Sequence, residues 1–130
     1  MRIYLAAPFS KFREAITVKN TLNALGHRVQ ASWLAAAAES LGVDTTDPLI
    51  ARKALAANTA DLRASEVFCA LAWPGLGQQL WCEAQEALHM VRPLHFVRMV
   101  PGSKLPLLAH AWGHIHDSLG EFVAAIAGAK

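Results

Sequence analysis

The run EVFCALAW at residues 66–73 limits the possible folds of this chain more than any other stretch, because it is almost continuously apolar. A strand with one solvated face alternates apolar and polar residues, whereas a strand that helices cover on both faces is apolar along its length. The run therefore predicts a central strand of a parallel sheet.

Strand-like and helix-like patterns alternate along the chain. Strands are predicted at residues 2–7, 27–33, 66–73, 93–100 and near 113–116, and helices at 10–25, 47–64, 78–91, around 104–111 and 118–127. Gly26 marks a helix end, Asp47 before Pro48 a helix start, and Asp117 a further N-cap. This order predicts a single α/β domain over residues 1–130, flavodoxin-like (Rossmann-like), with a five-stranded, mostly parallel sheet and helices on both faces.

The composition argues against several classes of function. Of the 130 residues, 54% are hydrophobic and 17% are charged, and the net charge is +2 without a basic run. Such a weak charge argues against a nucleic-acid groove or a membrane surface, and no apolar run reaches the roughly 18 residues that cross a bilayer. Cys69 and Cys82 are isolated, which indicates reduced thiols and neither a disulfide scaffold nor a zinc site. We therefore expect a cytoplasmic protein of a bacterium or of a phage-infected cell.

Ligands of parallel α/β sheets bind beyond the carboxyl ends of the strands. That rule points to the segments after the first and third strands, residues 7–13 and 74–79. The helix that follows the second of these segments reads GQQLWCEAQEALH, and its Glu83 lies beside an apolar stripe in an early turn. Two interpretations of Glu83 stay open at this point, a solvated helix residue or a carboxylate held for chemistry.

Four stretches carry a resemblance to a known family. They are IYLAAPFS with Tyr4, LNALGHRVQASWL, NTADLRASEVFCALAWPG, and a glycine-containing turn before Glu83, with Arg92-Pro93 nine residues after the glutamate and Ala87 between. In order and spacing they resemble the nucleoside 2-deoxyribosyltransferase-like family, including its small nucleotide N-glycosidase and phage-type members. The resemblance covers nearly the whole chain. It implies cleavage or transfer at the N-glycosidic bond of a (deoxy)nucleoside or nucleoside 5′-monophosphate.

The resemblance also implies a catalytic set of Glu83, Tyr4 and Asp61. Breaking a base–sugar bond creates positive charge at the anomeric carbon, where an ionised Glu83 would act as nucleophile or stabilise that charge. The helix dipole favours an anion in an early turn by roughly 0.3–1 kcal/mol. Tyr4 could hydrogen-bond and orient the carboxylate. Asp61 could, when protonated, give a proton to the leaving base, although a surface polar group is an equally good interpretation.

Substrate contacts are implied for a second set of residues. These are Pro8, Phe9, Arg13, Trp33, Asn58, Gly77 and Gln79. Arg13, together with Lys11, could bind a 5′-phosphate near a helix N-terminus, although two basic residues on a solvated helix turn are common. Phe9 and Trp33 could sandwich a base, and Trp33 could equally pack against the alanine-rich segment. Asn58 could recognise a base edge but cannot act as an acid.

No cofactor or metal is expected, because His114 and His116 would share a strand face without a third ligand nearby in the sequence. The expected partner is a small nucleoside or nucleotide. The apolar composition is compatible with the homodimer or higher oligomer that the resemblance implies.

Two other functions stay open. One is a catalytically weak or inactive nucleotide-binding protein of the same fold, which Asn58 and Gln85 favour, since many members have aspartate and glycine there. The other is an interaction domain without a small ligand.

Overall fold

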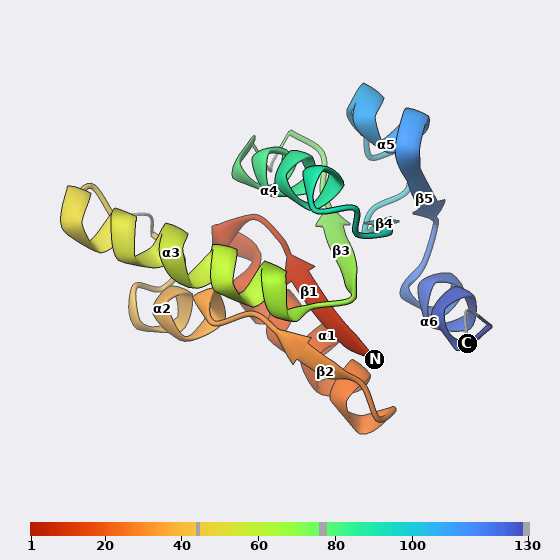
Figure 1. Ribbon diagram of the computed structural model, residues 1–130, viewed down its shortest axis with the longest axis horizontal. Helices are drawn as coiled ribbons and strands as arrows, with labels where there is room; N and C mark the ends of the chain where they lie inside the picture. Colours follow the sequence, from red (N-terminus) through yellow and green to blue (C-terminus); the bar gives the residue numbers. More distant parts are fainter. Residues whose placement is uncertain (44, 76–77, 129–130) are drawn as a thin grey trace.

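The computed structural model describes residues 1–43, 45–75 and 78–128, and its centre is a five-stranded sheet (Figure 1). The strands are β1 (Arg2–Ala6), β2 (Arg28–Gln30), β3 (Val67–Ala72), β4 (Leu94–Arg98) and β5 (Gly113–His116). Their order across the sheet is β2-β1-β3-β4-β5, and every neighbouring pair is parallel. The predicted flavodoxin-like α/β architecture is confirmed, with a sheet that is parallel throughout.

β3 is the central strand, and all six of its residues are buried. It pairs with β1 on one side, where Tyr4 lies opposite Phe68, and with β4 on the other, where Phe68 lies opposite Leu94. The apolar run at residues 66–73 has this place because helices exclude water from both of its faces. The burial also fixes which side chains of β1 and β4 point toward each layer of helices.

Helices cover both faces of the sheet. They are η1 (Phe9–Lys11, a 3-10 turn), α1 (Phe12–Ala24), α2 (Trp33–Glu39), α3 (Pro48–Ala64), α4 (Gln78–His89), α5 (Leu107–Trp112) and α6 (Leu119–Ala127). The buried residues of α1, α2 and α6 pack with Leu5 and Cys69 on one face. Those of α3, α4 and α5 pack with Tyr4 and Phe68 on the other. Within the described ranges, every helix is too short or too polar to cross a bilayer.

Two of the predicted helix ends are confirmed. Gly26 has a φ of +92° and closes α1 in a Schellman motif, a conformation that a residue with a Cβ rarely adopts. The Asp47 side chain accepts a hydrogen bond from the backbone N–H of Leu49 at 2.9 Å, and Pro48 is the first residue of α3. The end of α1 and the start of α3 are therefore set by local residues that the sequence alone identifies.

The predicted strand at residues 27–33 is too long. It ends at Gln30, and the helix α2 begins at Trp33. The buried residues of α2 are Trp33, Leu34 and Ala37, a spacing that brings them to one side of a helix but not of a strand. The alanine-rich stretch is thus a helix that the sequence analysis missed, and it forms part of the candidate site described below.

Asp117 is not the N-cap of the last helix. That position belongs to Ser118, whose hydroxyl accepts a hydrogen bond from the backbone N–H of Glu121 at 3.2 Å. Asp117 instead pairs with Arg98 of β4, with 2.9 Å between Nη1 and Oδ1. The cap thus lies one residue later than predicted, at a serine whose hydroxyl reaches the backbone N–H of Glu121, and the Asp117 carboxylate contacts Arg98 instead.

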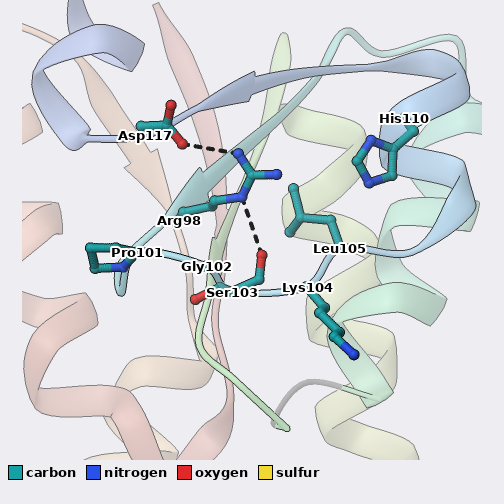
Figure 2. Close-up of a pocket in the computed structure, with 8 residues that line it drawn as sticks. All are labelled: Arg98, Pro101, Gly102, Ser103, Lys104, Leu105, His110 and Asp117. Carbon is teal, nitrogen blue, oxygen red and sulfur yellow. Dashed lines mark hydrogen bonds and ion pairs between the residues drawn. The ribbon is translucent and has the colours of Figure 1, made fainter.

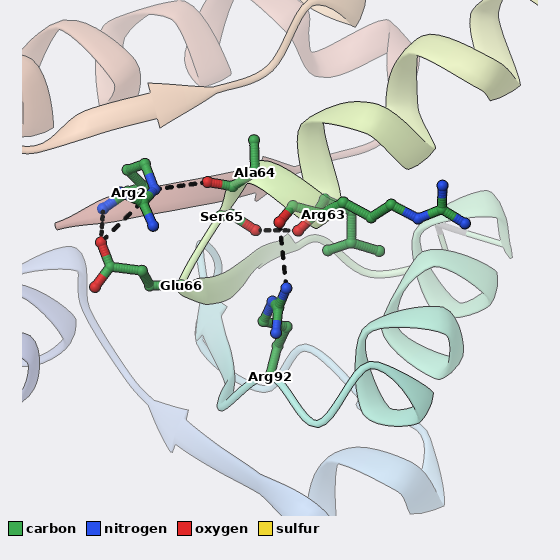
Figure 3. A network of polar contacts seen from close by, with 7 residues as sticks. Arg2, Arg63, Ala64, Ser65, Glu66 and Arg92 are labelled. Carbon is green, nitrogen blue, oxygen red and sulfur yellow. Dashed lines mark hydrogen bonds and ion pairs between the residues drawn. The ribbon is translucent and has the colours of Figure 1, made fainter.

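Side chains from three separate segments hold the C-terminal end of α3 (Figure 3). The guanidinium groups of Arg2 and Arg92 and the hydroxyl of Ser65 donate to its last three carbonyls, at 2.7, 3.2 and 2.7 Å. Such carbonyls have no partner within a helix. Arg92, which the family resemblance singled out, therefore fastens α3 to the turn between α4 and β4. Arg92 lies beyond the C-terminal end of α4, away from the first turns of that helix.

Three histidines lie side by side on β4 and β5. The His95 ring is stacked with those of His114 and His116, at centroid distances of 4.8 and 5.2 Å, and its Nδ1 lies 2.9 Å from His116 Nε2. Phe122 of α6 covers His95 and His116 edge-on. Burial, reinforced by the neighbouring histidines, lowers the pKa of His95 to about 4, and burial also lowers the pKa of His116. His95 and His116 are therefore both neutral at pH 7.

This histidine pair should make the fold sensitive to acid. The unfolded chain takes up a proton at His95 below about pH 6.5, whereas the folded chain does so only near pH 4. Between pH 7 and pH 5 the free energy of unfolding of the wild type should therefore fall, relative to His95→Gln, by about 1 to 2 kcal/mol after allowance for solvent screening. Urea titrations at both pH values measure this. His110→Gln, at an exposed histidine of α5, serves as control, and equal pH dependence of wild type and His95→Gln contradicts the prediction.

Candidate active site

A cavity of about 950 Å³ lies beyond the carboxyl ends of β1 and β3, the edge where ligands of parallel sheets bind. Its walls come from the segment after β1, from α2 and the loop after it, from α3, and from the first turns of α4. Of the site residues predicted from the sequence, those that line it are Pro8, Phe9, Trp33, Asn58, Gln79 and Glu83. The fold thus brings together residues that are up to 75 positions apart in the chain.

Glu83 is held at this cavity by Tyr4. The phenol hydroxyl donates a hydrogen bond of 2.7 Å to Glu83 Oε2, and both side chains are buried. The Tyr4 ring is stacked on Phe68 of the central strand, with ring centroids 5.8 Å apart, so the hydroxyl has a fixed direction. Helix α4 supplies the carboxylate and β1 the donor, which is the arrangement expected for these two residues.

Burial gives the Glu83 carboxyl an unusual affinity for its proton. Desolvation raises its pKa from 4.5 to about 7, hydrogen bonds from Tyr4 and Gln79 counter part of the rise, and the neighbouring Glu86 adds to it. The pKa of Tyr4 is also raised, first by burial and then by Glu83 and Asp61, so its hydroxyl stays protonated and remains a donor. A carboxyl that titrates near neutral pH beside a cavity is typical of a functional site.

The two polar residues predicted on α3 have different places. Asn58 lines the cavity, and its Oδ1 is buried without a hydrogen-bond partner in the described part of the chain. Asp61 does not line the cavity. Its Oδ2 accepts hydrogen bonds from the backbone N–H of Ser32, at 2.7 Å, and from the Ser32 hydroxyl. The geometry thus presents the amide to a ligand and turns the carboxylate toward the start of α2.

The aromatic side chains form one wall and not two. Phe9 and Trp33 have ring centroids 6.0 Å apart at an angle of 34°, the separation of aromatic rings in mutual contact. A base therefore has no room between them, and the expected sandwich is not formed. The indole N–H of Trp33 donates to the carbonyl of Leu5 at 2.9 Å, which fixes the ring against the sheet. Both rings remain predicted contacts for one face of a base.

The basic residues proposed for a phosphate lie outside the cavity lining. Arg13 is exposed on α1, with its guanidinium 5.1 Å from the ring centroid of Phe12. The Lys11 ammonium lies 5.5 Å from the ring centroid of Trp73, a cation–π arrangement. Each cation thus has an aromatic partner of its own. The predicted contact at Gly77 lies outside the described residues.

Sequence reasoning missed the wall that α2 and its following loop provide. Glu39, Ser40 and Thr45 line the cavity there, none of which was predicted. The available signal was the helical spacing of Trp33, Leu34 and Ala37, hidden among alanines that fit either face.

Gln85 of α4 is exposed and lies beside His89 one helical turn on, at 3.3 Å between side-chain nitrogens. The bulk of its side chain therefore does not intrude on the cavity.

A second hollow, of about 520 Å³, lies beyond the end of β4 (Figure 2). Its Arg98 already has two partners, Asp117 at 2.9 Å and the carbonyl of Ser103 at 3.2 Å. Leu105 lies between Arg98 and His110 in this hollow. No predicted site residue lines it, and the guanidinium of Arg98 is already engaged by Asp117 and Ser103, so the cavity at Glu83 is the better candidate.

Two solved structures resemble this chain over almost its full length. One is a 2-deoxyribosyltransferase from Bacillus psychrosaccharolyticus, with a TM-score of 0.70, 15% identity, and 94% of this chain and 90% of that one covered. The other is a CMP N-glycosidase from Clostridium botulinum, with a TM-score of 0.58, 13% identity, and 98% of each chain covered. All three share one fold. The resemblance inferred from the sequence is thus confirmed at the level of the fold. Neither a family model nor a curated protein matches the sequence.

The buried carboxylate should cost the protein stability at alkaline pH. Since the pKa of Glu83 rises from 4.5 to about 7 on folding, the wild type loses stability as the pH rises through that interval. We expect Glu83→Gln to be more stable than the wild type at pH 8, by up to roughly 3 kcal/mol, and the difference to shrink toward pH 4.5. Urea titrations at pH 4.5 and 8 measure this change.

A matched control for that titration is Glu14→Gln, at an exposed glutamate of α1. Its difference from the wild type should be small at both pH values, because an exposed carboxyl is not desolvated by folding. If the difference between Glu83→Gln and the wild type is the same at both pH values, burial does not raise the Glu83 pKa.

Proposed function

We propose that this protein cleaves or transfers at the N-glycosidic bond of a nucleoside or nucleoside 5′-monophosphate, with Glu83 as nucleophile. The observation that carries the proposal is the buried Glu83 carboxyl at the cavity, oriented by Tyr4 and with a pKa of about 7. The fold shared with a 2-deoxyribosyltransferase and a CMP N-glycosidase supports the same class of reaction. Hydrolysis and transfer differ only in the acceptor, water or a second base.

The proposed reaction is a double displacement. Tyr4 holds Oε2 of Glu83, which leaves Oε1 to attack the anomeric carbon. As the C1′–O bond forms, the C1′–N bond breaks and its electron pair leaves with the base. Water or a second base then attacks the same carbon and gives up a proton to solvent, and the glutamate departs as a carboxylate. Tyr4 does not touch the sugar in this scheme; it is a positioning residue that keeps the carboxylate directed and favours its ionised form.

The departing base has an amide and no carboxyl of α3 beside it. Asn58 lines the cavity and can donate a hydrogen bond from Nδ2 or accept one at its unpartnered Oδ1. Asp61 is engaged with Ser32, so it would have to leave that partner to act as an acid. In our proposal Asn58 recognises the base, and the proton that the leaving base acquires comes from solvent.

The engagement of Asp61 with Ser32 favours a second candidate function. Without an acid at the leaving base, the cavity would hold a nucleoside or nucleotide but turn it over slowly or not at all. Such a binding protein would use the same wall of Phe9 and Trp33 and the same amide of Asn58. Release of free base separates the two functions, because only the enzyme produces it.

The central test is base release by wild type and Glu83→Gln. The proteins are incubated with a panel of ribonucleosides, deoxyribonucleosides and their 5′-monophosphates, with and without a second base, and free base is measured by chromatography. We expect turnover by the wild type and a loss of roughly 10⁴-fold in kcat for Glu83→Gln, as is typical when a nucleophile is removed. The urea titrations described above establish that the variant is folded.

Three outcomes of that experiment have distinct meanings. Turnover that depends on Glu83 supports the enzyme, and its dependence on a second base separates transferase from hydrolase. Binding without base release favours the second candidate function. Equal activity of wild type and Glu83→Gln contradicts the role proposed for the carboxylate.

The pH profile tests the role of Tyr4. Because a nucleophilic Glu83 must be ionised, kcat/KM should fall about tenfold per pH unit below pH 7. Tyr4→Phe removes a hydrogen bond that lowers the Glu83 pKa but keeps the ring that stacks on Phe68. We expect this variant to lose roughly 10- to 100-fold in kcat and to need a higher pH for half-maximal kcat/KM. A reduced rate with an unshifted profile would argue against the positioning role.

A further inference from the structure

The charge of the cavity lining is unusual for a phosphate-binding site. Among the lining residues that the structure describes, Glu39 and Glu83 are acidic, and none is lysine, arginine or histidine. The remaining lining is apolar or carries neutral hydroxyl, amide or thiol groups. A nucleoside 5′-monophosphate carries roughly two negative charges at neutral pH, since the second pKa of a phosphate monoester is about 6. Those charges would enter a site that already holds carboxylates.

Nearby cations do not compensate for these carboxylates. Lys11 lies over the ring of Trp73 and Arg13 over that of Phe12, and neither lines the cavity. Lys53 of α3 is exposed and is also not a lining residue. The favourable elements for an anion are the starts of α1 and α4, where each helix N-terminus contributes about half a positive charge. Together they amount to about one positive charge, which is less than the two negative charges of Glu39 and of Glu83 in the ionised form that attacks.

We propose that the cavity binds an unphosphorylated nucleoside, and that Glu39 is a specificity-determining residue that rejects nucleoside 5′-monophosphates. This inference rests on the proposed function, in which Glu83 attacks the anomeric carbon. Glu39 is the last residue of α2 and lies at an exposed part of the lining, together with Ser40 and Thr45. A carboxylate there accepts a hydrogen bond from a sugar hydroxyl and repels a phosphate.

The test compares matched substrates, a nucleoside and its own 5′-monophosphate, on the wild type, Glu39→Gln and Glu39→Lys. For the wild type we expect kcat/KM for the nucleoside to exceed that for the monophosphate at least tenfold. Removing one facing charge in Glu39→Gln should reduce that preference by about tenfold at 0.15 M salt, and Glu39→Lys should reduce it further. Glu66→Lys makes the same change in net charge at an exposed residue before β3, outside the lining and away from the start of α1, and should leave the preference unchanged.

Failure of this inference is distinguishable from failure of the proposed function. If Glu83-dependent base release is faster from the monophosphate, the proposed function stands and the inference falls. A preference for the nucleoside that Glu39→Lys does not alter, or that Glu66→Lys alters equally, overturns the role of Glu39. If neither compound releases base, calorimetric titration of the wild type with the same pair decides. Tighter binding of the nucleoside supports the inference, and tighter binding of the monophosphate, or no binding of either, overturns it.

Discussion

The hydrogen bond between Tyr4 and Glu83 is the contact on which the rest of the candidate site depends. It joins β1 to α4 across 79 positions of sequence, and it exists only because β1 and β3 are adjacent and parallel. Parallel pairing brings the carboxyl ends of the two strands to one edge of the sheet, and α4 starts from that edge. The apolar sequence of β3 thus has a consequence for chemistry, since the strand that fills the core also places the carboxylate.

The burial that directs Glu83 also opposes its ionisation. Desolvation moves its pKa to about 7, and the hydrogen bonds from Tyr4 and Gln79 offset only part of that effect. An ordinary surface glutamate would be ionised at neutral pH but free to rotate and fully hydrated, so its reorganisation during the proposed reaction would be larger. The site thus combines a directed carboxylate with a stability cost, a balance found where activity opposes stability.

The sequence predicted the features that depend on local chemistry or on long runs. The central strand, the Gly26 helix end and the Asp47 cap follow from such signals, whereas the contact of Tyr4 with Glu83 was implied by the family resemblance. It failed where tertiary contacts decide which way a side chain points. Asp61 and Asn58 share one helix, yet only the amide lines the cavity, because Ser32 at the start of the unpredicted α2 holds the carboxylate. No periodicity within α3 distinguishes these two residues.

The missed helix α2 has a larger consequence, because a common fold does not decide whether a substrate bears a phosphate. The two solved relatives in fold are named for deoxyribosyl transfer and for cleavage of CMP, and this chain superposes on both over at least 94% of its length. In this chain the sheet accounts for the placement of the Glu83 carboxylate at the cavity. Charge around the rest of the substrate depends on segments such as α2 and its loop, where Glu39 lies. Under the proposal for Glu39, a substitution at one exposed residue of that wall changes the substrate charge preference without any change in the core.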